Sequence, residues 1–427
     1  MTAAARPLRV VLVTSVVARH DAISGSFLDL LATLRAEEGI ITTGLAGATD
    51  VTSPGLRCVA GVTGLLTDDD FCAADVIIYE FGIWYEGFNA LLIGNGHGRQ
   101  VVRFHNITPP GLVPPRLRPL VLRSFEQLHN IGRADEVWAV SPENARIAIA
   151  YGAAPERIAD LPLSVRPGVL ARLADKSSTP FSILFIGRFV PAKGVHELIG
   201  AWRLLRAEGA PSFEVILAGN EAYSDPAYLA RLRTQVAAAG DAVHLRGTVD
   251  DATLAGLLRR AHVIALPSYH EGFGKPVIEG LAAGCIPVGY ASAALPHAVA
   301  GFGRLVDPGD VAGLAQALRA VLDALAGGAP LPLDRGETPV AVFDTLAAEY
   351  ATGFAPPKIG TQIVTRLRAL APPSSPPPDA DGRTVAPPRR PAAVRPAPAA
   401  DPVRPAAMAG RAGGGGFFRL SGVRPRK

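Results

Sequence analysis

Residues 271–284, EGFGKPVIEGLAAG, place two carboxylates, Glu271 and Glu279, eight positions apart, with two glycines, a lysine and a proline between them. The apolar stretch before them, HVIALPS (262–268), has the length and composition of a buried strand, and a helical pattern follows. Glycines between a strand and a helix let backbone N–H groups approach an anion, because no Cβ intervenes. Pro276 suits the first helical position, which would place Glu279 in the first turn. The stretch therefore predicts an anion-binding loop that opens a helix.

Backbone amides suit phosphates and carboxylates suit sugar hydroxyls, so this loop fits a sugar nucleotide. Two other interpretations stay open. A glutamate in the first turn of a helix can simply complement the helix dipole. Glu271 and Glu279 can also form the acid/base pair of a glycoside hydrolase, whose carboxylates stand about 5 to 10 Å apart. The anion-binding surroundings favour the sugar nucleotide over the hydrolase.

Strand and helix patterns alternate along the chain, which is typical of α/β layers around a parallel sheet. A first set ends near residue 165, a linker covers 166–180, and a second set follows. We therefore expect an α/β fold of two Rossmann-like domains facing across a cleft, with ligands at the carboxyl ends of the strands. The predicted strands include 9–15, 75–81, 99–106, 135–141 and 262–268, and the predicted helices include 26–39, 142–152 and 310–325, the last with Asp310 as N-cap.

The expected boundaries are 1–170 for the first domain and 178–335 for the second, followed by a helix over 336–355 that packs back towards the first domain. Residues 356–427 are rich in Pro, Ala and Arg, with thirteen Lys/Arg against three Asp/Glu, a net charge of +10. The rest of the chain carries about −6, given the total of +4. Such a segment buries too little apolar surface to offset its ordering entropy, so we expect a disordered basic tail.

The plain interpretation of the tail is a solvated extension, and the alternative is peripheral contact with an anionic partner such as the inner face of a membrane. No nucleic-acid partner is expected, because nothing in the folded part supports one. Three cysteines, Cys58, Cys72 and Cys285, are too few and too scattered for a disulfide framework or a zinc site. No signal-peptide pattern or apolar stretch of membrane-spanning length occurs, so we expect a cytoplasmic protein.

A second motif, FIGRFVPAKG (185–194), ends a predicted strand and places Arg188 and Lys193 at its carboxyl end. Arginine offers a planar fork and lysine a point charge, so together they can hold a diphosphate. They would also stabilise the charge that develops on a departing phosphate. A lysine near a helix start can also be merely solvated, and the later EGFGKPVIE stretch makes the diphosphate interpretation the stronger one.

Two weaker signals lie in the first half of the chain. VVRFHNITPP (101–110) places His105 at the carboxyl end of a strand, where a lone histidine is more often structural than functional. After the first strand, Gly25 marks a loop that can approach a ligand closely. A helix N-cap formed by Ser24 or Ser26 is an equally good interpretation of that segment.

The E-x7-E spacing of EGFGKPVIE, together with FIGRFVPAKG and FHNITPP, closely resembles the motifs of retaining glycosyltransferases of the GT-B fold, glycosyltransferase family 4 in particular. The resemblance is close over 181–325, patchy over 9–165 and absent from the tail. It departs at His297, where many relatives carry a glutamate, and at Gly25, where relatives often carry paired glycines.

This resemblance implies transfer of a hexose from a nucleoside diphosphate sugar to an acceptor, with retention of the anomeric configuration and without a metal or other cofactor. The second domain would hold the nucleotide, and the first would meet the acceptor. Carried over motif by motif, Glu279 meets the ribose hydroxyls, Arg188 and Lys193 the diphosphate, the backbone of Phe273 and Gly274 the phosphate and sugar, Glu271 the hexose hydroxyls and His105 the reacting sugar, while Gly25 and Gly187 allow close backbone approach.

Rival functions stay open. A sugar-nucleotide epimerase or a phosphorylase of the same fold would use similar residues for other chemistry. A catalytically silent scaffold would bind a sugar nucleotide and recruit partners through the tail, although such a protein has no physical need for the complete set of charged residues. The acidic run Asp68 to Asp70 is predicted to be a turn or helix cap, so no metal site is expected.

Overall fold

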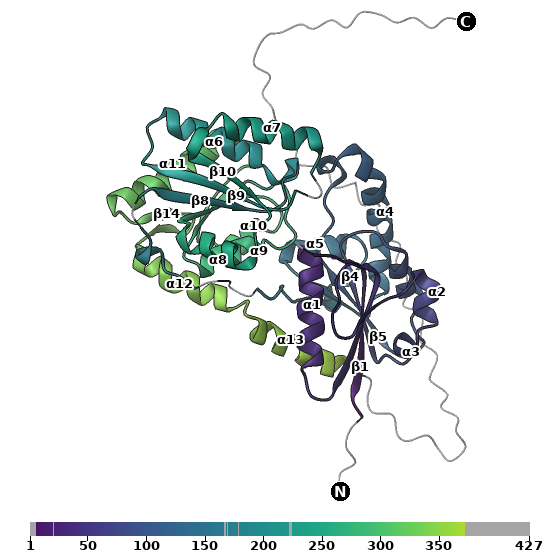
Figure 1. Cartoon of the computed structure of the whole chain (residues 1–427). Helices are drawn as coiled ribbons and strands as arrows, with labels where there is room; N and C mark the ends of the chain where they lie inside the picture. The colour runs from purple at the N-terminus through teal and green to yellow at the C-terminus, as the bar shows by residue number, and fades with distance from the viewer. Residues whose placement is uncertain are drawn as a thin grey trace, which may run out of the picture. The chain divides into compact units, whose positions relative to one another are not determined.

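The structure is a computed structural model that describes residues 6–371, apart from residues 20, 166–167, 169, 178 and 222–223. Two parallel β-sheets with flanking helices make up this part of the chain (Figure 1). The predicted α/β class with two successive parallel-sheet domains is therefore confirmed. The tail expected at the C-terminus lies, from residue 372 onward, outside the described residues.

The first domain is built on a seven-stranded sheet in the order β3-β2-β1-β4-β5-β6-β7. Its central strands are mainly apolar, because both faces of a parallel sheet are covered. The strand order reverses between β1 and β4, and ligands of open α/β sheets bind at such switch points. The strands are β1 (Leu8–Val17), β2 (Ile40–Thr49), β3 (Leu56–Cys58), β4 (Val76–Phe81), β5 (Arg99–Phe104), β6 (Glu136–Ala139) and β7 (Ile158–Asp160), and the helices are α1 (Ala22–Arg35), α2 (Gly61–Leu66), α3 (Asp69–Cys72), α4 (Arg118–Leu128) and α5 (Pro142–Ala150).

The second domain repeats this plan on a six-stranded sheet in the order β10-β9-β8-β11-β12-β13, with the switch point between β8 and β11. A small antiparallel hairpin, β14 (Leu331–Leu333) with β15 (Gly336–Thr338), follows it. The strands are β8 (Phe181–Ile186), β9 (Phe213–Ala218), β10 (Val243–Gly247), β11 (Val263–Leu266), β12 (Ile286–Tyr290) and β13 (Arg304–Val306), and the helices are α6 (Val195–Ala207), α7 (Pro226–Ala237), α8 (Asp251–Arg260), α9 (Lys275–Ala282), α10 (Leu295–Val299) and α11 (Val311–Gly327).

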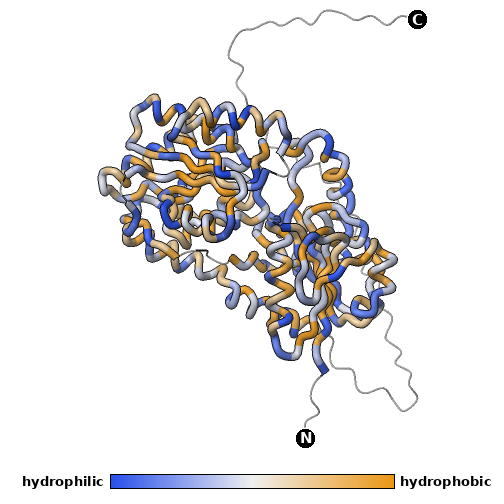
Figure 2. Tube along the Cα trace, in the orientation of Figure 1, coloured by the Kyte–Doolittle hydropathy of each residue, from blue (hydrophilic) through white to orange (hydrophobic). Residues whose placement is uncertain are grey.

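Each sheet lies at the centre of a hydrophobic core, and Figure 2 shows apolar residues concentrated along the strands. Successive side chains of a strand point to opposite faces, so Val11 and Val13 of β1 join one cluster of the first domain while Val10 and Leu12 join the other. The second domain has one large cluster that unites its sheet with α6, α9 and α11. The sites described below therefore stand on well-packed sheets.

The last two helices divide between the domains. α12 (Val340–Thr352) packs against α9 of the second domain, and Asp344 accepts hydrogen bonds from the backbone N–H of Leu173 at 2.6 Å and of Ala174 at 3.1 Å. α13 (Pro356–Leu370) packs against α1 of the first domain, as Figure 1 shows. Val165 donates to the Phe354 carbonyl at 2.8 Å, so the two segments that connect the domains touch each other.

The predicted C-terminal boundaries are therefore wrong. The helix that packs back on the first domain is not 336–355, and the chain is not a tail from residue 356, because Pro356 opens a fifteen-residue helix. Ile359, Ile363 and Leu367 form an apolar stripe at helical spacing, buried with α1. The prolines and arginines around this stripe dominate the composition and conceal it.

Helix caps confirm some predictions and correct one. Asp310 caps α11, as predicted, and Asp68 caps α3, so the acidic run is a helix start. α1 is capped by Asp21 and not by Ser24 or Ser26, because the Asp21 carboxylate accepts from the Ser24 N–H. Within the described ranges there is no cluster of three or more metal-binding side chains, and no helix there is long and apolar enough to cross a membrane.

Candidate active site

Loops that follow neighbouring strands of the second sheet meet at its carboxyl edge because glycines permit it. Gly194 has a φ of 64°, and a Cβ there would overlap the carbonyl oxygen of Pro267. A Cβ at Gly219 would likewise overlap the carbonyl oxygen of Gly187. Only glycine fits such close approach, so these residues bring the loops after β8, β9 and β11 together.

The central contact of the site is an ion pair between the loops after β8 and β11. The Lys193 Nζ lies 2.6 Å from the Glu271 Oε1 and donates to the His270 carbonyl at 3.2 Å. Burial would raise the pKa of Glu271, but the charge and hydrogen bond of Lys193 outweigh it and hold the pKa below its usual range. Burial, helped by Lys193, lowers the pKa of His270 to about 4, so this histidine is neutral.

The start of α9 differs from the prediction by one residue. Gly274, with a φ of 90°, is the N-cap, so Lys275 is the first helical residue and Pro276 the second. Glu279 is then the fifth residue of α9, beyond its first turn, and the prediction that it lies in the first turn is wrong. The dipole effect falls off within the first turn, so capping does not explain Glu279.

Glu279 is half-buried and has no hydrogen-bond or ion-pair partner among the described residues. Burial raises its pKa to about 7; Lys275 opposes this shift and Asp251 adds to it. A carboxylate oxygen without a partner can accept a hydrogen bond from a ligand hydroxyl. Glu279 is therefore free to accept a hydrogen bond from a ligand.

Arg188 and Gly187 follow β8 directly, as predicted. Arg188 is exposed and has no ion-pair partner in the part of the chain that the structure describes. The Gly187 N–H donates to the Ala218 carbonyl at 3.1 Å, so this amide is already used within the protein. Arg188 is therefore free to meet a ligand anion, whereas Gly187 contributes by lacking a side chain.

His105 follows β5 and meets the loop that carries Glu271. A Cβ at Gly272 would overlap the His105 carbonyl oxygen, so the two motifs touch through their backbones. The His105 ring is held by the first sheet: its Nε2 is hydrogen-bonded to the Glu80 carboxylate in β4. Sequence reasoning missed Glu80 and its partner Arg103, although a charge inside the apolar runs VIIYEF and RQVVRF is a visible signal.

Gly25 is the fourth residue of α1, and a Cβ there would meet no atom within 4 Å. Packing therefore does not demand glycine at this position. Phe273 turns its buried ring against Phe354 in an edge-on contact, with centroids 5.7 Å apart. A pocket of about 290 Å³ lies beside this ring. Residues of both domains line it, among them Ser141, Asp160, Phe273, His297 and Tyr350.

Comparison with known families agrees with this geometry. Residues 180–324, which include Arg188, Lys193, Glu271 and Glu279, match the family model of glycosyl transferases group 1. The second domain is a group 1 glycosyltransferase domain. The motifs quoted from the sequence and the side chains that the fold brings together thus fall within the matched residues.

Curated relatives of this glycosyltransferase domain align over part of their length. The MMP alpha-(1->4)-mannosyltransferase of Mycolicibacterium hassiacum is 30% identical over 214 residues, which are 48% of this chain and 51% of that protein. The glycogen synthase of Mycobacterium tuberculosis is 36% identical over 146 residues, 34% of each chain. The chain thus spans about half or less of the length of these relatives.

Solved structures share the fold over most of the chain. HepE of Anabaena, in complex with UDP and glucose, gives a TM-score of 0.64 at 16% identity, covering 84% of this chain and 100% of that one. Sucrose-phosphate synthase of Thermosynechococcus elongatus gives 0.66 at 19% identity, covering 85% and 99%. These similarities confirm the two-domain GT-B fold that the sequence predicts.

The raised pKa of Glu279 predicts that nucleoside diphosphate binding depends on pH near neutrality. The ionised carboxylate is the better acceptor for ribose hydroxyls. It predominates only at a pH above its pKa of about 7. Binding should therefore weaken by roughly tenfold from pH 8 to pH 6. Calorimetric titration of the nucleotide that binds best, repeated across this range, measures the effect.

Glu279→Gln is the matched control for this titration, because it keeps the shape of the side chain and removes its titration. The nucleotide itself gains a proton near pH 6, but this contribution is common to both proteins. We expect Glu279→Gln to bind more weakly at pH 8 and to show a flatter profile. Identical profiles in the two proteins would contradict a role of Glu279 in binding.

Proposed function

We propose that this protein is a glycosyltransferase that moves a hexose from a nucleoside diphosphate sugar to an acceptor, with retention of the anomeric configuration. The observation that carries the proposal is the contact of Lys193 with Glu271 in the loop before α9, with Glu279, which has no partner among the described residues, within that helix. In this proposal Glu279 binds ribose hydroxyls, Glu271 binds hexose hydroxyls and Lys193 binds the diphosphate. Membership of the second domain in the group 1 glycosyltransferases supports it.

The chemistry of such a site is electrostatic. Negative charge gathers on the diphosphate as the bond to the sugar breaks, and Lys193 with Arg188 would stabilise it. We propose that no metal is required, because these two cations supply the positive charge. Lys193 contacts Glu271, so in this proposal one ammonium would orient both the sugar-binding carboxylate and the leaving group.

The first domain would bind the acceptor. Its His105 carbonyl oxygen lies close to Gly272 in the loop 267–274 before α9, which we call the donor loop. An acceptor placed at the carboxyl edge of the first sheet would therefore face the donor sugar. The named relatives include a mannosyltransferase and a glycogen synthase, so the proposal extends to hexosyl transfer and names no particular hexose or acceptor. The HepE structure holds UDP and glucose, which supports a nucleoside diphosphate sugar as donor.

A calorimetric screen against UDP, GDP, ADP and dTDP, with and without Mg²⁺, tests the donor site. We expect one nucleotide to bind selectively and equally well without the metal, because Lys193 and Arg188 provide the cationic contacts. Binding that needs Mg²⁺ would overturn the metal-free proposal, and no binding at all would favour a silent scaffold. Turnover of the matching sugar nucleotide to an epimer without acceptor would identify an epimerase instead.

Substitution of the central ion pair tests the site assignment. We expect Lys193→Ala and Glu271→Gln each to lower transfer by at least about a hundredfold, the usual scale for loss of one charge-stabilising contact. Lys358→Ala, at an exposed lysine of α13, is the matched control and should retain activity. Melting temperatures close to that of the wild type would confirm folding, and wild-type rates in either site variant would refute the assignment.

We also propose that the protein is cytoplasmic and contacts an anionic membrane face peripherally. The basic tail that suggests such contact from the sequence lies outside the described residues. Within them, Arg116 just before α4 and Arg118 and Arg123 in α4 lie exposed and have no ion-pair partner there. Leu122 beside them is 51% exposed, and the Arg123 guanidinium lies 3.7 Å from the centre of the Trp84 ring. Cations next to an exposed apolar side chain match the chemistry of an anionic bilayer surface.

Co-sedimentation of the full chain with phosphatidylcholine vesicles, with and without phosphatidylglycerol, tests this surface. We expect binding only to the anionic vesicles and a loss of about tenfold or more in the variant Arg116→Gln/Arg118→Gln/Arg123→Gln. The matched control, Arg203→Gln/Arg206→Gln/Arg231→Gln, removes three exposed arginines of the second domain. Equal binding by the two variants would assign any membrane contact to the tail alone.

A further inference from the structure

Two charged residues lie side by side in the interior of the first sheet. Glu80 of β4 and Arg103 of β5 are register partners, and their side chains are 0% and 2% exposed. The Arg103 Nη1 donates to the Glu80 Oε1 at 3.2 Å, while the other carboxylate oxygen is hydrogen-bonded to the His105 Nε2. Burial would raise the pKa of Glu80, but Arg103 and His105 outweigh it and keep the carboxyl ionised.

This buried network reaches the candidate active site through His105. A histidine nitrogen that faces a carboxylate carries the proton, so Glu80 fixes the tautomer and the orientation of the ring. The next residue, Asn106, has a left-handed φ of 72° and donates through its side chain to the Asn144 Oδ1 at 2.9 Å. The turn that presents the His105 carbonyl to Gly272 is therefore held by side chains on both sides.

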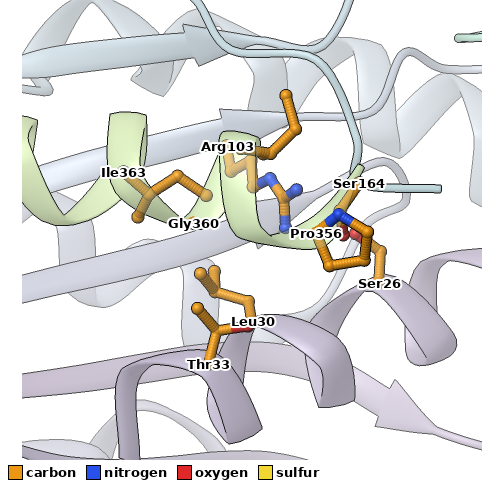
Figure 3. A pocket seen from close by; sticks show the side chains of 9 residues that line it. Ser26, Leu30, Thr33, Arg103, Ser164, Pro356, Gly360 and Ile363 are labelled. Carbon is orange, nitrogen blue, oxygen red and sulfur yellow. The ribbon is translucent and has the colours of Figure 1, made fainter. Parts of the chain in front are cut away.

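The Arg103 end of the network is closed to ligands. The Arg103 guanidinium lines a cavity of about 10 Å³, together with Ser26 and Leu30 of α1 and Gly360 and Ile363 of α13 (Figure 3). A cavity of this size admits nothing larger than a water molecule, so Arg103 does not serve a ligand there. A Cβ at Gly360 would approach the Thr33 side chain to 3.0 Å, which shows how tightly α13 seals the cavity against α1.

The ion pair between Glu80 and Arg103 is not explained by its contribution to folding stability. Two buried charges contribute little more than an apolar pair of similar volume, because desolvation offsets their attraction. What the carboxylate adds is a fixed acceptor for the His105 ring beside the donor loop. We propose that Glu80, with Arg103 as its counter-ion, is a positioning residue that holds His105 for sugar transfer. This inference rests on the proposed glycosyltransferase function.

The informative variant removes both charges together. Glu80→Gln alone would leave Arg103 buried and uncompensated, which endangers folding. Glu80→Met/Arg103→Met keeps the volume, so we expect it to fold and to bind the nucleoside diphosphate as the wild type does. Its kcat/KM for transfer should fall at least tenfold, because the His105 ring has lost its acceptor. A wild-type kcat/KM in this variant would overturn the proposal.

A second double variant separates positioning from packing. Glu80→Gln/Arg103→Met restores a neutral amide oxygen that can accept from the His105 Nε2, so we expect it to recover most of the lost kcat/KM. In a His105→Ala background, Glu80→Met/Arg103→Met should lower kcat/KM by less than twofold, because its effect runs through His105. No recovery in the first case, or a full tenfold loss in the second, would assign the pair to packing.

Binding measurements distinguish failure of this inference from failure of the proposed function. A wild type that binds no nucleoside diphosphate, or binds one but gains no affinity from the attached sugar, would overturn both. If the wild type binds the sugar nucleotide more tightly than the nucleotide alone, Glu80→Met/Arg103→Met should lose that difference while keeping its affinity for the nucleotide. Retention of the difference would overturn the positioning role and leave the proposed function standing.

Discussion

The contact between Lys193 and Glu271 is the constraint on which the rest of the site depends. The two residues belong to loops after different strands, and β8 must pair with β11 before they can meet. The approach also requires Gly194, because any side chain there would collide with Pro267. Once made, the contact holds Glu271 ionised in spite of burial and fixes the loop from which α9 begins. The position of this loop and the ionised state of Glu271 therefore both depend on the contact with Lys193.

The same loop and helix hold a second carboxylate in the opposite state. Glu271 has a cation at 2.6 Å and a lowered pKa, whereas Glu279 has no partner among the described residues and a pKa raised to about 7. A hydrolase acid/base pair would also show diverging pKa values, so this divergence alone does not decide the chemistry. The ion pair favours the proposed transfer, because the Lys193 cation beside Glu271 would also stabilise the charge of a leaving diphosphate. The arrangement suits transfer from a nucleotide better than attack by water.

The sequence predicted the alternation of strands and helices, the two sheets and the loops that carry Lys193 and Glu271, because these follow from local patterns and glycine spacing. It misplaced α13, since its apolar stripe is short and surrounded by prolines and arginines. The partner of His105 also escaped prediction, because Glu80 lies 25 positions earlier and meets it only through strand pairing. The environment of Glu279 depends on burial, which the spacing of two glutamates does not reveal.

The fold ties the two domains together more closely than their separate sheets suggest. The first domain completes its core with Ile359, Ile363 and Leu367, which follow its last strand by some two hundred residues and come after the whole second sheet. Such long-range contacts form late, since closing the intervening chain costs entropy. The cavity wall behind Arg103 includes α13, so the surroundings of the Glu80 network are complete only when the end of the folded chain is in place. The network that is hydrogen-bonded to His105 is therefore enclosed by helices from both ends of the folded chain.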